Sequence, residues 1–186
     1  QHLVVFVGRL SAEKNLDILL DAWPLVLRHH PDAHLCLVGD GGTFRNAEPE
    51  LHRQAGCLGV EASVHFAGRV RDVTEYLLAA DVFVLPSSTE GMSNALLEAM
   101  AVGVAVVASR VPGNCELISD QDNGLLVEPR NSQVLAEAII RLLSAPEEGA
   151  HLGRAARETV SSRFAIQRIG QRYAALYAEL LGNGRP

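Results

Sequence analysis

Two acidic residues stand eight positions apart around a glycine turn and the start of a predicted helix. Glu90 opens the run Glu90-Gly91-Met92-Ser93-Asn94, and Glu98 follows within the helix. Eight residues span a little over two helical turns, so Glu98 can face the same cleft as the loop before it. Carboxylates accept hydrogen bonds from the paired hydroxyls of a diol, which indicates a hydroxyl-rich ligand. For two acids taken alone, solvent exposure is the commoner explanation.

The backbone of the same segment is suited to an anion. Met92, Ser93 and Asn94 lie where the predicted helix at residues 93–100 begins. The first N–H groups of a helix lack intrahelical acceptors and carry the positive end of the helix dipole. Amides for a phosphate and acids for hydroxyls in one segment together indicate a nucleotide sugar.

A loop with two cations follows the first predicted strand, in the run Gly8-Arg9-Leu10-Ser11-Ala12-Glu13-Lys14-Asn15. Arg9 offers a planar fork of donors and Lys14 a mobile point charge, beside a flexible glycine and a helix start. These groups suit a dianionic diphosphate. The alternative is that both cations are solvated surface residues and that Glu13 neutralises one of them, and this loop alone does not decide between the two.

Three further glycine turns follow predicted strands. The run Gly39-Asp40-Gly41-Gly42 lacks the full dinucleotide-binding fingerprint, so we predict either a close approach of backbone to ligand or a simple turn. The run Phe66-Ala67-Gly68-Arg69-Val70 combines a turn with an apolar residue that can flank a planar base. Gly113-Asn114, ahead of Glu116, opens a short predicted helix towards the same cleft.

Short apolar segments alternate with amphipathic ones along the chain, which predicts an α/β fold with a doubly wound, Rossmann-like parallel sheet. Strands are predicted at residues 3–7, 34–38, 63–66, 81–85, 104–108 and 124–127. Helices are predicted at residues 15–29, 44–58, 72–79, 93–100 and 114–118, with extra C-terminal helices at 132–144, 146–164 and 165–181. Ligands bind such sheets beyond the carboxyl ends of the strands, where all the loops above fall.

The last predicted helix carries an apolar stripe that needs a covering surface. Two surfaces are open to it: the core of this domain, or a partner domain that the chain does not include. The stripe consists of Ile166, Ile169, Tyr173, Leu176, Tyr177 and Leu180.

Length and composition predict a single domain over residues 1–186, with 48% hydrophobic residues to fill one core. The net charge of -6, from 16 Lys plus Arg against 22 Asp plus Glu, argues against nucleic acid as a partner.

Apolar runs are far too short to span a bilayer, and the start does not read as a signal peptide. Cys36, Cys57 and Cys115 lack metal-ligand spacing, so we predict small buried side chains in a reducing compartment.

Taken together, these motifs resemble the C-terminal, donor-binding domain of family-4 (group 1) retaining glycosyltransferases of the GT-B fold. The similarity begins at Gly8-Arg9 and Glu13-Lys14-Asn15, and passes the glycine loop at Gly39 to a Glu-x7-Glu signature at Glu90 and Glu98. It continues through Glu98-Ala99-Met100-Ala101, Gly113-Asn114 and Asn123-Gly124-Leu125-Leu126-Val127. The chain departs from many relatives at Val104-Ala105, where they carry Pro, and at Pro112-Gly113, where they carry two glycines.

The resemblance implies a role for each candidate residue. Arg9 and Lys14 would hold the donor diphosphate and Glu90 the transferred sugar, which makes these three the catalytic candidates. Glu98 would bind the ribose hydroxyls. The other substrate-binding candidates are backbone positions around the sugar and phosphates, and a pair beside the base: Gly8, Gly39, Gly41, Gly91, Met92, Ser93, Asn94 and Ala95, with Arg69 and Val70 at the base.

The same resemblance implies transfer of a hexose, with retention, from a nucleotide diphosphate sugar to a glycan or lipid-linked acceptor. UDP-sugars are favoured by family frequency, and the Glu90-Gly91-Met92-Ser93-Asn94 run is similar to the bacterial envelope and exopolysaccharide branch. No cofactor or metal is expected in the donor site, because the cations offset the charge that grows on the leaving diphosphate.

The acceptor site would belong to an N-terminal domain absent from this chain, and the immediate entry from Gln1-His2 into a strand fits a start at a domain boundary. The isolated chain should then be inactive. The full protein is expected in the cytoplasm, or at the inner face of the membrane. A nonenzymatic nucleotide-binding module and a GT-B-fold sugar-nucleotide epimerase are the alternatives, and the sequence does not identify the base, sugar, acceptor or oligomeric state.

Overall fold

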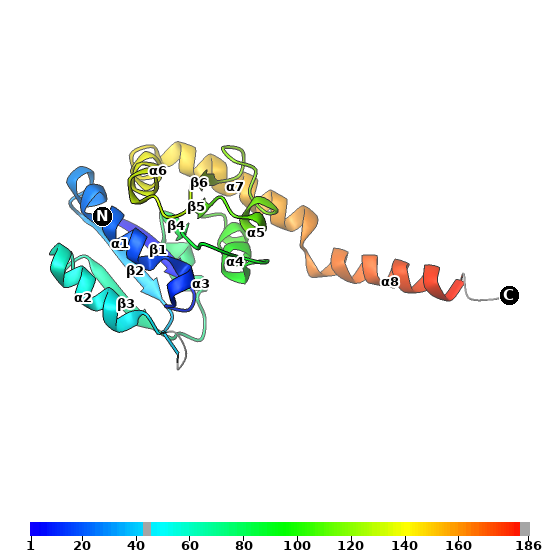
Figure 1. Ribbon diagram of the computed structural model, residues 1–186. Coiled ribbons are helices and arrows are strands. Elements are labelled where there is room, and N and C mark those ends of the chain that lie inside the picture. Colours follow the sequence, from blue (N-terminus) through cyan, green and yellow to red (C-terminus); the bar gives the residue numbers. More distant parts are fainter. Residues whose placement is uncertain (43–45, 183–186) are drawn as a thin grey trace.

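Six parallel strands form one sheet in the order β3-β2-β1-β4-β5-β6 in the computed structural model, which describes residues 1–42 and 46–182 (Figure 1). Each neighbouring pair runs parallel. The predicted α/β fold class is therefore confirmed, and each strand lies within two residues of its predicted position. The strands are β1 (His2–Val7), β2 (Ala33–Val38), β3 (Val64–Gly68), β4 (Val82–Leu85), β5 (Ala105–Ser109) and β6 (Leu125–Val127).

Helices cover both faces of the sheet, as strands that are apolar on both faces require. On one face α1 (Leu16–His29) packs against α2 (Glu48–Leu58) and α6 (Ser132–Ser144). On the other, α4 (Asn94–Val102) packs against α3 (Thr74–Ala79) and α7 (Pro146–Arg163). A 3-10 turn η1 (Ala12–Lys14) precedes α1, a short α5 (Pro112–Cys115) follows β5, and α8 (Ile166–Gly182) ends the chain.

The core is centred on β1 and α1. Val4, Val5 and Phe6 are fully buried, since the middle strands are enclosed by helices on both sides. Five residues of α1 recur at helical spacing and turn one face onto the sheet: Leu16, Leu19, Leu20, Trp23 and Val26. The indole Nε1 of Trp23 donates to Ser63 Oγ at 2.9 Å, so the largest buried ring keeps a polar partner.

Three predictions differ from the structure. The helix predicted at 44–58 begins at Glu48, where Asn46 Oδ1 accepts from the Glu48 backbone N–H at 2.9 Å, and positions 44 and 45 lie outside the described residues. The helix predicted at 114–118 begins earlier, at Pro112, whose fixed φ suits a first helical turn. Cys36 is buried as predicted, but Cys57 and Cys115 are exposed, so the prediction of burial is wrong for them.

The last helix projects away from the sheet and its covering helices (Figure 1). Tyr173, Leu176, Tyr177 and Leu180 are between 49% and 61% exposed. Packing of the stripe on this domain's own core is therefore wrong for these four residues, and a partner domain stays open as the alternative. The side chains of Ile166 and Ile169 lie outside the described ones. Within the described ranges, no helix has both the length and the hydropathy to cross a membrane.

Candidate functional site

The strand order reverses between β1 and β4, which lie side by side at the centre of the sheet. Loops that leave two such strands diverge to opposite faces and open a crevice at the carboxyl edge, where α/β proteins bind ligands. A cavity of about 350 Å³ lies there. Its lining combines the loop after β1 with the loop and helix start after β4: Val7, Gly8, Arg9, Glu13, Lys14, Glu90, Met92, Ser93, Asn94 and Ala95.

A short ion pair joins the two sides of this cavity. Lys14 Nζ lies 2.6 Å from Glu90 Oε1, and the two side chains are only 19% and 9% exposed. Ser87 Oγ donates to the same oxygen at 2.6 Å. Shielding from water strengthens such contacts. The ammonium has three donors, so one contact with Glu90 leaves capacity for an anion.

Main-chain contacts hold the two loops together. The backbone N–H of Ser88 donates to Glu13 O at 2.9 Å, and the Asn15 side-chain amide donates to Pro86 O at 3.1 Å. Asn15 is buried and left-handed at φ 49°, a conformation that asparagine adopts more readily than most residues. The residues before and after Lys14 are therefore tied to the residues before Glu90, which fixes the spacing of the ion pair.

Two glycines let the backbone of these loops come close. A Cβ on Gly113 would lie 1.7 Å from Gly91 O and 2.5 Å from Glu90 O, so the start of α5 directly supports the Glu90 loop. A Cβ on Gly39, at φ +137°, would lie 1.9 Å from Gly8 O. The close approach seen at Gly39 is thus to the chain itself, and its predicted approach to a ligand stays a prediction.

The start of α4 lines the cavity. Ser93 caps the helix, with its Oγ accepting from the Leu96 backbone N–H at 3.3 Å, and Asn94 and Ala95 form the first turn and line the cavity. Glu98 is exposed and lies outside the described lining. It follows Asn94 by four residues, so it lies on the same side of α4 one turn farther along.

The remaining predicted residues follow the same edge of the sheet away from the cavity. The backbone N–H of Gly39 donates to Gly68 O at 2.9 Å, which places the ends of β2 and β3 side by side. Arg69 is exposed and Val70 half-buried just beyond, and neither they nor Gly41 belong to the described lining. Gly91 is exposed over Gly113. The structure thus brings together Gly8, Arg9, Lys14, Glu90 and residues 92–95, and the contacts of Arg69 and Val70 with a base stay a prediction.

Sequence reasoning missed Ser87, the contact of Asn15, and the support role of Gly113. Ser87 stands three residues before Glu90, a spacing at which a hydroxyl can reach the acid, and this was the one available signal. The contacts of Asn15 and Gly113 join loops from different strands, so no local pattern contains them.

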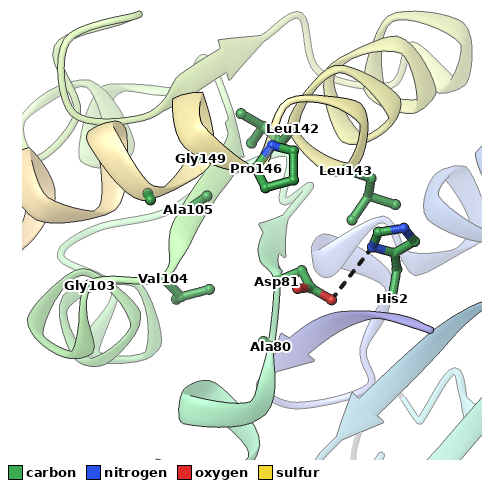
Figure 2. A pocket seen from close by; sticks show the side chains of 11 residues that line it. His2, Ala80, Asp81, Gly103, Val104, Ala105, Leu142, Leu143, Pro146 and Gly149 are labelled. Atoms are coloured by element: carbon green, nitrogen blue, oxygen red, sulfur yellow. Dashed lines mark ion pairs between the residues drawn. The ribbon is translucent and has the colours of Figure 1, made fainter.

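A second hollow of about 240 Å³ lies at the opposite, amino edge of the sheet, beside the corner between α6 and α7 (Figure 2). Its polar members are His2 and Asp81, whose Nδ1 and Oδ2 atoms lie 3.9 Å apart. Asp81 Oδ2 also accepts from the Leu3 backbone N–H at 2.7 Å, so it secures the end of β1. Leu142 and Leu143 contribute apolar wall.

In the described part of the chain, no group of three or more His, Cys, Asp or Glu residues could hold a metal ion. The cavity at the carboxyl edge instead presents Arg9, Lys14 and helix amides as its positive groups. Whether the donor site works without a metal stays a prediction.

Known proteins are similar to this chain in sequence and in fold. The family model "Glycosyl transferases group 1" matches residues 1–145. The lipopolysaccharide core biosynthesis glycosyltransferase LpsE of Rhizobium meliloti (strain 1021) is 33% identical over 176 residues, which cover 95% of this chain and 49% of LpsE. HepE from Anabaena, solved in complex with UDP-glucose, is 32% identical with a TM-score of 0.88, over 96% of this chain and 49% of HepE.

A third structure covers a similar stretch of protein. The C-terminal domain of the group 1 family protein LpcC from Francisella tularensis is 27% identical with a TM-score of 0.80, over 89% of this chain and 87% of that one. This chain spans about half the length of LpsE and HepE. The predicted Rossmann-like sheet with extra C-terminal helices, one half of a GT-B fold, is confirmed. The chain belongs to the group 1 glycosyltransferase family.

Proposed function

We propose that this chain is the donor-binding domain of a retaining hexosyltransferase that uses a nucleotide diphosphate sugar. The observation that carries the proposal is the shielded pair of Lys14 and Glu90, 2.6 Å apart. The pair shares a cavity with the first turn of α4, where the strand order reverses between β1 and β4. A cation, an acid and helix amides at one site match the phosphate and hydroxyl groups of such a donor.

The diphosphate binds between Arg9, Lys14 and the amides of Asn94 and Ala95, where a fork, a point charge and a helix dipole meet. Glu90 accepts from hydroxyls of the sugar. Glu98, one turn farther along α4, accepts from the ribose, and the base lies towards Arg69 and Val70 at the end of β3.

This arrangement stabilises the departing nucleoside diphosphate. As the bond between the sugar and the phosphate breaks, negative charge grows on the phosphate oxygens beside Arg9 and Lys14. Positive groups that are already in place contribute several kcal/mol of stabilisation in such sites. The leaving phosphate takes the proton of the acceptor hydroxyl, which attacks from the same face, and the donor site needs no metal or cofactor.

The comparisons support the wider setting of this proposal. The similarity to the LpcC domain along almost its full length supports a C-terminal position, and the half coverage of HepE supports an N-terminal acceptor domain. The UDP-glucose in HepE supports a UDP-sugar donor. The name of LpsE supports a glycan or lipid-linked acceptor in bacterial envelope synthesis. The proposal places the full protein in the cytoplasm or at the inner membrane face.

Isothermal titration of the chain with UDP-glucose, UDP, GDP, ADP and uridine tests the proposal. We expect at least one nucleoside diphosphate to bind more tightly than uridine. We also expect UDP-glucose to bind. If none of these compounds binds at millimolar concentration, the proposal fails. Binding without transfer after fusion to the N-terminal half would instead favour a nonenzymatic module, and conversion of the sugar without an acceptor, followed by NMR, would favour an epimerase.

A further inference from the structure

Ser87 is a fully buried serine directly behind the site. It follows β4 by two residues and is 0% exposed. Burial of a hydroxyl costs free energy unless the hydroxyl is hydrogen-bonded. Its Oγ meets this requirement through the carboxylate of Glu90, at 2.6 Å. The serine therefore serves an acid that itself lines the cavity.

Both contacts that the described residues make with the Glu90 carboxylate use the same oxygen. Lys14 Nζ and Ser87 Oγ each lie 2.6 Å from Oε1. Two short hydrogen bonds to one oxygen fix the rotation of the carboxylate and leave the other oxygen, Oε2, available to additional donors. A bound sugar hydroxyl is such a donor.

The two partners of Oε1 differ in stiffness. Lys14 reaches Glu90 through a flexible four-carbon stem, so its ammonium can shift when its other donors bind a phosphate in the cavity. Ser87 has one rotatable side-chain bond, and its neighbour Pro86 is held by the Asn15 side-chain amide at 3.1 Å. The serine contact is thus the one that persists when the ammonium turns towards a ligand.

We propose that Ser87 is a positioning residue, which holds Oε1 of Glu90 so that Oε2 stays aligned with a hydroxyl of the donor sugar while Lys14 binds the diphosphate. This inference rests on the proposed function. It assigns to the Ser87 hydroxyl a part of the preference for a nucleotide sugar over the bare nucleoside diphosphate.

Titrations of UDP and of UDP-glucose into the wild-type chain and Ser87→Ala test this role. UDP should bind the variant within about twofold of wild type, whereas UDP-glucose should bind about tenfold more weakly, as expected for a lost hydrogen bond to a charged group. Ser87→Thr and Ser87→Val form a matched pair of nearly equal shape that differ in the hydroxyl. Only the threonine variant should keep the preference, and this pair decides the question if Ser87→Ala does not fold.

Combination with Glu90→Ala separates positioning from a general structural role. In the Glu90→Ala background, Ser87→Ala should change the ratio of UDP to UDP-glucose affinity less than about twofold, because its effect acts through that acid. An unchanged ratio in Ser87→Ala, or equal losses of both ligands, overturns the inference alone. A wild-type chain that binds neither ligand overturns the proposed function and the inference with it.

Discussion

The two edges of the sheet each hold an acidic side chain beside a basic one, in very different settings. At the carboxyl edge, Lys14 and Glu90 lie 2.6 Å apart and are 19% and 9% exposed. At the amino edge, His2 and Asp81 lie 3.9 Å apart and are 29% and 49% exposed (Figure 2). A shielded pair acts strongly on a neighbouring ligand, whereas an exposed pair is screened by water.

Backbone packing produces this difference. At the carboxyl edge, Gly113 and Gly39 let one loop rest on the main chain of the next. At the amino edge, Asp81 binds the end of β1, and the side chains of Leu142 and Leu143 form the wall. The proposed donor site thus lies at the carboxyl edge, whereas the contact of Asp81 at the amino edge secures the start of β1. Substitutions of site residues at the carboxyl edge should therefore change nucleotide affinity, whereas substitutions at the amino edge should change only stability.

The largest effect is expected at Gly113. In Gly113→Ala the new methyl group would clash with the carbonyl oxygen of Gly91, which the backbone holds in place. The free energy of unfolding should therefore fall by about 3 kcal/mol or more. Gly56→Ala is the matched control, since no atom lies within 4 Å of its Cβ and alanine favours a helix. Urea unfolding measures both, and similar stabilities of the two variants would contradict the support role of Gly113.

Removal of the shielded cation comes next. Lys14→Ala should weaken UDP binding about 30-fold, as expected for the loss of a charged contact to phosphate, and should leave uridine binding almost unchanged. Asp81→Asn at the amino edge should leave UDP affinity within about twofold. Calorimetric titration gives all three values. Equal losses for UDP and uridine, or a comparable loss in Asp81→Asn, would remove the distinction between the edges.

Substitution of Glu98, which is exposed one turn beyond the cavity, should have a smaller effect on nucleotide binding. Wild type should prefer UDP over 2′-deoxy-UDP by about fivefold, and Glu98→Ala should lose that preference, because the lost hydrogen bonds are to the ribose. Competition binding with the two nucleotides measures the ratio. Glu98→Gln keeps an acceptor oxygen and should show an intermediate ratio. If wild type already binds both nucleotides alike, the ribose assignment is wrong.

The smallest effect is expected at the amino edge, from His30. Burial lowers the pKa of this imidazole below its ordinary value of 6.5, and the nearby His2 lowers it further. The folded chain therefore binds this proton less readily than the unfolded chain. The stability that His30 contributes is present above pH 6.5 and is lost as the pH falls through the lowered pKa.

Substitution of this histidine should flatten the pH dependence of stability. Because His30 is partly exposed, water screens the effect, and His30→Asn should change the pH dependence of unfolding between about pH 7 and 5 by less than about 1 kcal/mol. Asparagine keeps a polar contact for Ser144 Oγ, which His30 Nε2 meets at 3.0 Å. An unaltered pH profile would show that groups other than His30 determine the pH dependence of stability. Altered UDP binding in His30→Asn would show that the amino edge affects the site at the carboxyl edge.

The sequence predicts the sheet well because its central strands are continuous apolar runs, such as residues 3–7, bounded by loops with glycine or proline. The sequence also identifies Lys14 and Glu90 as candidate site residues, since each belongs to a recognisable loop. The contact between them spans 76 positions, and that of Asn15 with Pro86 spans 71, so neither follows from local spacing. The stripe of α8 shows that a helix face needs cover, but not which surface covers it.

The most direct test is a crystal structure of this chain with UDP-glucose. The diphosphate should lie between Lys14 and the first turn of α4, with a glucose hydroxyl within hydrogen-bond distance of Glu90 and the ribose beside Glu98. A ligand bound in the hollow beside His2 and Asp81, or a diphosphate without contact to Lys14, would contradict the assignment of the carboxyl edge as the donor site.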